Sequence, residues 1–128
     1  MIRFILVALT VVLFLILSIP LLAVLWVMDR FDRQRRQRIS IRVIQGIFRF
    51  ILKLAGVQIT IEGLEQVPKD RAVLYVGNHR SYFDILVGYT TVPGLTGFVA
   101  KKEMDRYILL RDWMRNVNCL FLDRKNIK

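Results

Sequence analysis

The chain has 128 residues, 55% of them hydrophobic, and its twenty basic and ten acidic residues give a net charge of +10. This length has room for one small domain. A single cysteine, Cys119, excludes an internal disulfide, and one histidine without a cysteine pair supplies too few ligands for a zinc site, so no bound metal is expected.

Residues 4–28 form an unbroken run of 25 residues without a charged side chain, rich in Leu, Val and Ile. As one helix this run measures about 37 Å, which exceeds the roughly 30 Å thickness of a bilayer core. It is too long for the apolar part of a signal peptide, and residues 25–29 make a poor cleavage site. We therefore expect residues 1–28 to form a transmembrane helix, or a membrane-embedded pair if Pro20 divides the run, with a full span favoured.

Arginines flank this segment unequally. Arg3 precedes it, whereas five arginines follow it closely, at positions 30, 33, 35, 36 and 38. Because positive residues stay on the cytoplasmic side, everything after residue 28 is expected to face the cytoplasm from an inner or cytoplasmic membrane. The lone cysteine fits that reducing compartment, and we interpret Cys119 as a small buried side chain on a strand.

The excess of positive charge suits nucleic acid, anionic lipid or an anionic substrate. The apolar segment favours membrane lipids, so no nucleic-acid partner is expected. Within residues 29–56 the pattern predicts a basic amphipathic helix over 39–55, and its polar stripe consists of Arg42, Gln45, Arg49 and Lys53. The apolar remainder of this helix suits either the membrane interface or packing on the domain core, and both assignments stay open.

The elements expected after residue 56 follow an order typical of α/β proteins. Strict alternation predicts a half-exposed edge strand over 57–62, and a continuous apolar run predicts a strand buried on both faces over 72–76. Ser81 can cap a helix over 82–89. A strand over 95–100, a helix over 103–116 with Trp113 and Met114 facing inward, and a strand over 118–122 complete the series. This order predicts an α/β layered domain around a mostly parallel sheet.

Polar residues follow three of these strands. Asn78 and His79 follow the second strand, Lys101, Lys102 and Glu103 follow the third, and Asp123 and Arg124 follow the fourth. In open α/β sheets, functional groups gather beyond the carboxyl ends of the strands. His79 is a candidate general base, and Asp84, in the first turn of the next helix, is the candidate carboxylate that orients it. A lone histidine is, however, more often structural. The neighbouring cations suit an anionic acceptor, although lysines and arginines are usually solvated.

Three sequence blocks resemble a known family. The segment Asn78-His79-Arg80-Ser81-Tyr82-Phe83-Asp84 is similar to the Asn-His-x-x-x-x-Asp motif of the glycerolipid acyltransferases, specifically the 1-acyl-sn-glycerol-3-phosphate acyltransferases. The blocks at residues 98–104 (FVAKKEM) and 120–124 (LFLDR) are similar to later blocks of the same family. The resemblance covers residues 57–125 in order and spacing, and it identifies residues 57–128 as the N-terminal part of an acyltransferase domain.

The resemblance implies transfer of a fatty acyl group to the sn-2 hydroxyl of lysophosphatidic acid, giving phosphatidic acid in phospholipid biosynthesis. His79 and Asp84 are then catalytic, and the expected substrate-binding residues are Asn78, Arg80, Ser81, Lys101 and Arg124. The acyl donor would be acyl-CoA or acyl-carrier protein, with no further cofactor. Two alternatives remain: the same chemistry on another lysophospholipid or on glycerol 3-phosphate, and a non-catalytic membrane-surface module.

One block of the family is absent from the sequence. The later Phe-Pro-Glu-Gly-Thr block, which the resemblance associates with acceptor binding and closure of the site, does not occur before Lys128. The sequence is therefore expected to be C-terminally truncated, with an unpaired sheet edge and an incomplete site.

Overall fold

The computed structural model describes residues 1–78 and 80–123, and the N-terminal apolar segment forms two helices in it. Helix α1 spans Ile2–Leu17 and helix α2 spans Ile19–Asp29, with a bend of 50° between them at Ser18. Pro20 lies in the first turn of α2, where a residue without an N–H is tolerated. Within the described ranges no single helix is long and apolar enough to cross a membrane, but the bent pair together meets that length and composition. The expected continuous helix over 4–28 is therefore wrong, and the divided pair is what forms.

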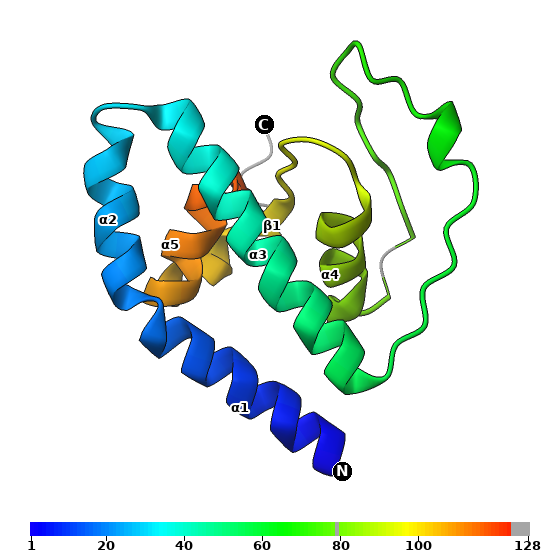
Figure 1. Ribbon diagram of the computed structural model, residues 1–128, viewed down its shortest axis with the longest axis horizontal. Helices are drawn as coiled ribbons and strands as arrows, with labels where there is room; N and C mark the ends of the chain where they lie inside the picture. The colour runs from blue at the N-terminus through cyan, green and yellow to red at the C-terminus, as the bar shows by residue number, and fades with distance from the viewer. Residues whose placement is uncertain (79, 124–128) are drawn as a thin grey trace.

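Helix α3 spans Arg33–Ala55 and crosses the middle of the molecule, with α2 and α5 to one side and α4 to the other (Figure 1). It begins where the Asp32 carboxylate accepts a hydrogen bond from the Arg35 N–H at 2.8 Å, six residues before the predicted start. It ends at Gly56, which has a left-handed conformation with φ +77°. The apolar side of α3 is buried against the other helices, so packing on the core is confirmed for that side.

The described residues of the long segment between α3 and α4 form no strand. Residues 57–78 form a largely exposed loop at the edge of the molecule, interrupted by one short 3₁₀ turn at Leu64–Gln66 (Figure 1). Leu74 and Val76 are 85% and 88% exposed. The strands predicted over 57–62 and 72–76 are therefore wrong for this structure. A strand forms only when a neighbour accepts its backbone hydrogen bonds, and neither segment lies in the sheet.

The last part of the chain follows the predicted order of elements more closely. Helix α4 spans Tyr82–Thr91, strand β1 spans Val99–Lys101, a 3₁₀ helix η2 spans Lys102–Arg106, helix α5 spans Ile108–Asn116, and strand β2 spans Leu120–Leu122. The predicted helix over 103–116 is thus divided into η2 and α5. Strands β1 and β2 pair in parallel, with Val99 opposite Leu120 and Lys101 opposite Leu122. The described sheet has these two strands, so the fold is a mixed helical one with a small parallel sheet.

The core lies where α2, α3, α4 and α5 meet. Its buried members are Leu25, Ile41, Ile44, Tyr89, Trp113 and Val117. Trp113 is buried as predicted, while Met114 and Cys119 are only half-buried. Burying apolar side chains contributes about 25 cal/mol per Å², so burial of this cluster stabilises the packing of the four helices.

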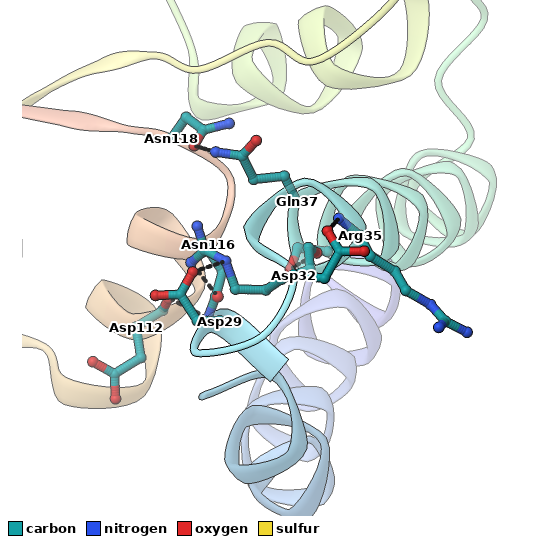
Figure 2. Close-up of polar contacts among 9 residues, drawn as sticks. Asp29, Asp32, Arg35, Gln37, Asp112, Asn116 and Asn118 are labelled. Carbon is teal, nitrogen blue, oxygen red and sulfur yellow. Dashed lines mark hydrogen bonds and ion pairs between the residues drawn. The ribbon is translucent and has the colours of Figure 1, made fainter. Parts of the chain in front are cut away.

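Polar contacts join the corner between α2 and α3 to the end of α5 (Figure 2). The Arg36 guanidinium lies 3.0 Å from the Asp29 carboxylate and donates a hydrogen bond to the Asn116 side-chain oxygen at 2.9 Å. Gln37 donates to the Asn118 side-chain oxygen at 2.9 Å. Arg36 is buried, and removing one partner of a buried charge is costly, so these contacts fix where α5 lies against α3.

Candidate active site

The segment that contains the candidate base leads directly into helix α4. Ser81 is the N-cap of α4, and its Oγ accepts a hydrogen bond from the Phe83 N–H at 3.2 Å. The Asp84 carboxylate reaches back and accepts hydrogen bonds from the N–H groups of Arg80, at 2.7 Å, and Ser81, at 2.8 Å. Ser81 and Asp84 thus form a capping box, which the Ser-x-x-Asp spacing of the sequence encodes locally. His79 lies outside the described residues.

This geometry gives Asp84 a defined place and direction. Two backbone donors hold one of its carboxylate oxygens, which lies at the start of a helix, where the helix dipole interacts favourably with a carboxylate. Asp84, Ser81, Arg80 and Asn78 are all exposed, so their side chains are open to a ligand. A helix cap needs the same contacts, so this hydrogen-bond pattern by itself accounts for the start of α4.

The carboxyl ends of β1 and β2 lie side by side. Because Lys101 is opposite Leu122 in the parallel register, the residues that follow each strand come together. The Lys102 Nζ lies 2.9 Å from the Asp123 Oδ2. This hydrogen bond, together with the negative charge of Asp123, raises the pKa of the Lys102 ammonium above its ordinary value. Lys101 is exposed beside this pair, and Arg124 lies outside the described residues.

The structure therefore brings together two of the three polar groups expected at one edge of the sheet. The third group does not join this edge through a strand, because residues 72–76 are not part of the described sheet, and Ser81 is instead the N-cap of α4. Sequence reasoning did not anticipate the contact between Lys102 and Asp123. Its signal was available, since each residue directly follows one of two parallel strands.

The chemistry open to the described residues is that of oriented carboxylates and cations. Among them, no group of three or more His, Cys, Asp or Glu side chains is placed to hold a metal ion. A carboxylate fixed at a helix start can orient an imidazole, and lysine and arginine side chains can bind a phosphate group.

Comparison with known proteins identifies similar sequences. Residues 58–128 match the family model described as Acyltransferase, and this range includes both the start of α4 and the two strand ends. A probable 1-acyl-sn-glycerol-3-phosphate acyltransferase from Mycoplasma pneumoniae is 38% identical over 96 residues, which are 70% of this chain and 35% of that protein. A second, from Mycoplasma genitalium, is 36% identical over 83 residues, covering 60% of this chain and 30% of that protein.

A third relative, the 1-acyl-sn-glycerol-3-phosphate acyltransferase of Borreliella burgdorferi, is 26% identical over 91 residues, covering 71% of this chain and 36% of that protein. The chain thus spans about a third of the length of the curated relatives it matches. No solved structure matches the chain at a significant level.

Proposed function

Because the chain belongs to the acyltransferase family, we propose that it transfers a fatty acyl group to the sn-2 hydroxyl of lysophosphatidic acid, giving phosphatidic acid in phospholipid biosynthesis. The observation that carries the proposal is the family match over residues 58–128, which contains all the candidate site residues. The names of the three relatives support this acceptor. The acyl donor is a thioester, either acyl-CoA or acyl-carrier protein, and the reaction needs no further cofactor.

In the proposed reaction His79 is the general base. Its imidazole takes the proton of the acceptor hydroxyl as the hydroxyl oxygen attacks the thioester carbonyl carbon, so that the new C–O bond forms without a covalent acyl-enzyme. The C–S bond then breaks, and the leaving thiolate takes the proton back from the imidazolium. Asp84 orients the imidazole and stabilises its positive charge. The two backbone hydrogen bonds to Asp84 support this role, because they hold a carboxylate five residues after His79.

The proposed phosphate site consists of Lys101 and Arg124, while Asn78, Arg80 and Ser81 line the acceptor site beside the base. The contact between Lys102 and Asp123 supports the phosphate site, because it sets the residue before Arg124 beside the end of β1. We also propose a membrane location with this region facing the cytoplasm. The exposed apolar side chains of α1 and α2 support contact with lipid. They equally suit a non-catalytic membrane-surface module, which the assay below distinguishes.

The test is acyl transfer by the reconstituted chain, with lysophosphatidic acid as acceptor and labelled acyl-CoA or acyl-carrier protein as donor. His79→Ala should lower kcat by about 10²–10⁴-fold, since a positioned base contributes that much. Asp84→Asn should lower kcat strongly while keeping an oxygen that can cap α4. Arg124→Ala should raise the KM of the acceptor about tenfold or more and leave the KM of the donor nearly unchanged.

Ser81→Ala is the comparison for Asp84→Asn, with kcat at saturating acceptor as the readout, because a lost acceptor contact at Ser81 would raise the KM of the acceptor. It removes the other half of the capping box and leaves the Asp84 carboxylate in place. If both variants lose the same kcat, Asp84 acts only as a helix cap. Full turnover by His79→Ala contradicts the catalytic assignment, and no turnover by the unsubstituted chain with either donor contradicts the proposal for this chain. Faster turnover with glycerol 3-phosphate or another lysophospholipid would replace the acceptor.

A further inference from the structure

Two surface depressions adjoin each other at the corner between α2 and α3. The first is apolar, with a volume of about 540 Å³, and Val24 and Val27 of α2 and Phe31 of the connecting turn form much of its lining. The second is basic, with a volume of about 460 Å³, and its lining includes Arg35, Arg38 and Arg42. Asp32 and Arg35 line both depressions. An apolar surface and a basic surface are therefore adjacent at this corner.

The three arginines that line the basic depression make no ion pair with the described residues. Arg35, Arg38 and Arg42 are exposed at spacings of three and four, so they share one side of α3. Among residues 1–78 and 80–123, none of these three guanidinium groups pairs with a carboxylate. Arg36 differs, since it is buried and contacts Asp29 and Asn116. Figure 2 shows the Arg35 side chain extending away from these contacts.

Asp32 is the one acidic residue that lines the two depressions, and its carboxylate already accepts the Arg35 N–H as the cap of α3. Residues 29–42 as a whole contain six arginines and two aspartates, so the corner keeps a clear excess of positive charge. Like charges three or four residues apart on a helix repel each other. A bound anion would relieve this repulsion.

The apolar side of the corner is open to the surroundings. Phe31 is 85% exposed and Trp26 is 63% exposed, and the Arg30 guanidinium lies 4.6 Å from the centre of the Trp26 ring. Amphipathic aromatic rings beside arginines are typical of the boundary between lipid tails and headgroups. Valine and phenylalanine side chains gain from contact with acyl chains, which neither water nor nucleic-acid phosphate offers.

We propose that this corner is a docking site for anionic phospholipid at a membrane surface. Arg35, Arg38 and Arg42 bind headgroup phosphates, and Val24, Val27 and Phe31 contact the adjoining acyl chains. Planar guanidinium groups bind phosphate oxygens in pairs, and each arginine held near an anionic surface contributes about fivefold to binding. The lining of the site shares no residue with the candidate active site, and the proposal does not depend on acyl transfer.

The experiment compares binding of the detergent-solubilised chain to nanodiscs of phosphatidylcholine alone and of phosphatidylcholine mixed with anionic phosphatidylglycerol. The measured quantity is the affinity for anionic nanodiscs divided by the affinity for neutral nanodiscs. Apolar insertion of α1 contributes to both affinities, so it cancels in this ratio. The double variant Arg38→Gln/Arg42→Gln should lower this ratio by about 25-fold, because two arginines of the corner are lost. Phe31→Ser should weaken binding to both kinds of nanodisc and leave the ratio unchanged.

The matched control is Arg49→Gln/Lys53→Gln. This variant removes two exposed charges near the C-terminal end of α3, and the two positions have the same spacing as Arg38 and Arg42. It should change the ratio less than threefold if the corner is the site. Equal losses in the two double variants would mean that the whole basic side of α3 acts as a diffuse charge, which overturns the proposal. A single-stranded oligonucleotide that displaces the chain from anionic nanodiscs at a similar affinity would also overturn it, because the corner would then bind any polyanion.

Discussion

Tyr89 of α4 contacts both helix α3 and the segments that precede strands β1 and β2. It is 3% exposed, and its ring packs 5.7 Å from the Phe48 ring of α3 and 4.6 Å from the Phe98 ring before β1. Its hydroxyl lies 3.2 Å from the Cys119 Sγ and donates a hydrogen bond to the Val117 carbonyl at 3.4 Å. Burial, followed by the nearby Cys119 thiol, raises the pKa of the Tyr89 hydroxyl far above its ordinary value.

This pKa shift predicts a loss of stability at high pH. Above about pH 10 the unfolded chain releases the tyrosine proton while the folded chain keeps it, so the free energy of unfolding falls as pH rises. Tyr89 alone should account for about 1.4 kcal/mol at one pH unit above 10. The measurement is chemical denaturation at neutral and at alkaline pH, with Tyr89→Phe as the comparison. An equal alkaline loss in both proteins would show that Tyr89 does not titrate in this way.

At the scale of the element, helix α3 packs against all four other α-helices that the structure describes. Its buried side carries Ile41, Ile44, Ile51 and Leu52, and its exposed side carries the basic residues other than Arg36. The Gln45 of the predicted polar stripe is half-buried and donates to the Tyr89 carbonyl at 3.0 Å, whereas Arg42, Arg49 and Lys53 are exposed. The structure thus separates the stripe into one residue that links α3 to α4 and three that stay outside.

Alanine is expected to have opposite effects at a glycine inside α3 and at the glycine that ends it. Gly46 is inside the helix and exposed, and a Cβ there would meet no atom within 4 Å. Gly46→Ala should therefore raise the free energy of unfolding by about 0.5–1 kcal/mol. Gly56 has φ +77°, so Gly56→Ala should lower the free energy of unfolding by about 1–2 kcal/mol. Thermal or chemical denaturation measures both, and a stabilising Gly56→Ala would contradict the left-handed helix end.

At the scale of the whole molecule, the bent N-terminal pair is attached to α5 at its break. The Trp113 Nε1–H donates a buried hydrogen bond of 2.8 Å to the Ser18 Oγ, and the Trp113 ring lies 5.2 Å from the Phe14 ring. Ser18 in turn donates to the Leu15 carbonyl at 3.0 Å. A residue at the bend of the apolar segment and a residue of the acyltransferase region therefore share one contact, 95 positions apart in the chain.

This contact predicts energetic coupling between the two parts. In a double-mutant cycle, Ser18→Ala and Trp113→Phe should show a coupling of about 1 kcal/mol in the free energy of unfolding, the value of a typical hydrogen bond. The control pairs Trp113→Phe with Thr91→Ala, whose hydroxyl bonds to the Val87 carbonyl of its own helix at 2.8 Å. These two changes should add to within about 0.5 kcal/mol. Additivity of Ser18→Ala with Trp113→Phe would mean that the hydrogen bond does not hold the bend.

Features that depend on a few neighbouring residues were predictable from the sequence. Ser81 as a cap predicted the start of α4, and the helix predicted over 39–55 ends at the same residue as α3, because helix ends depend on local hydrogen-bond and backbone effects. The two parallel strands and the family were also predictable, since residues 98–104 and 120–124 form short recognisable blocks. For the candidate site, the sequence predicted which residue types matter, and the roles of His79 and Arg124 stay predictions.

Features that depend on distant partners were decided only by the tertiary structure. The segments at 57–62 and 72–76 have the composition of strands, yet a strand exists only if another strand receives its hydrogen bonds, and neither segment has such a neighbour in the described sheet. The bend at Ser18, the contact of Lys102 with Asp123, and the outward direction of Arg35 and Arg38 likewise follow from packing between elements. The sequence by itself determined the family and the local caps, because short-range signals suffice for both. The tertiary structure decided which residues meet, because that depends on contacts between parts of the chain that are far apart in the sequence.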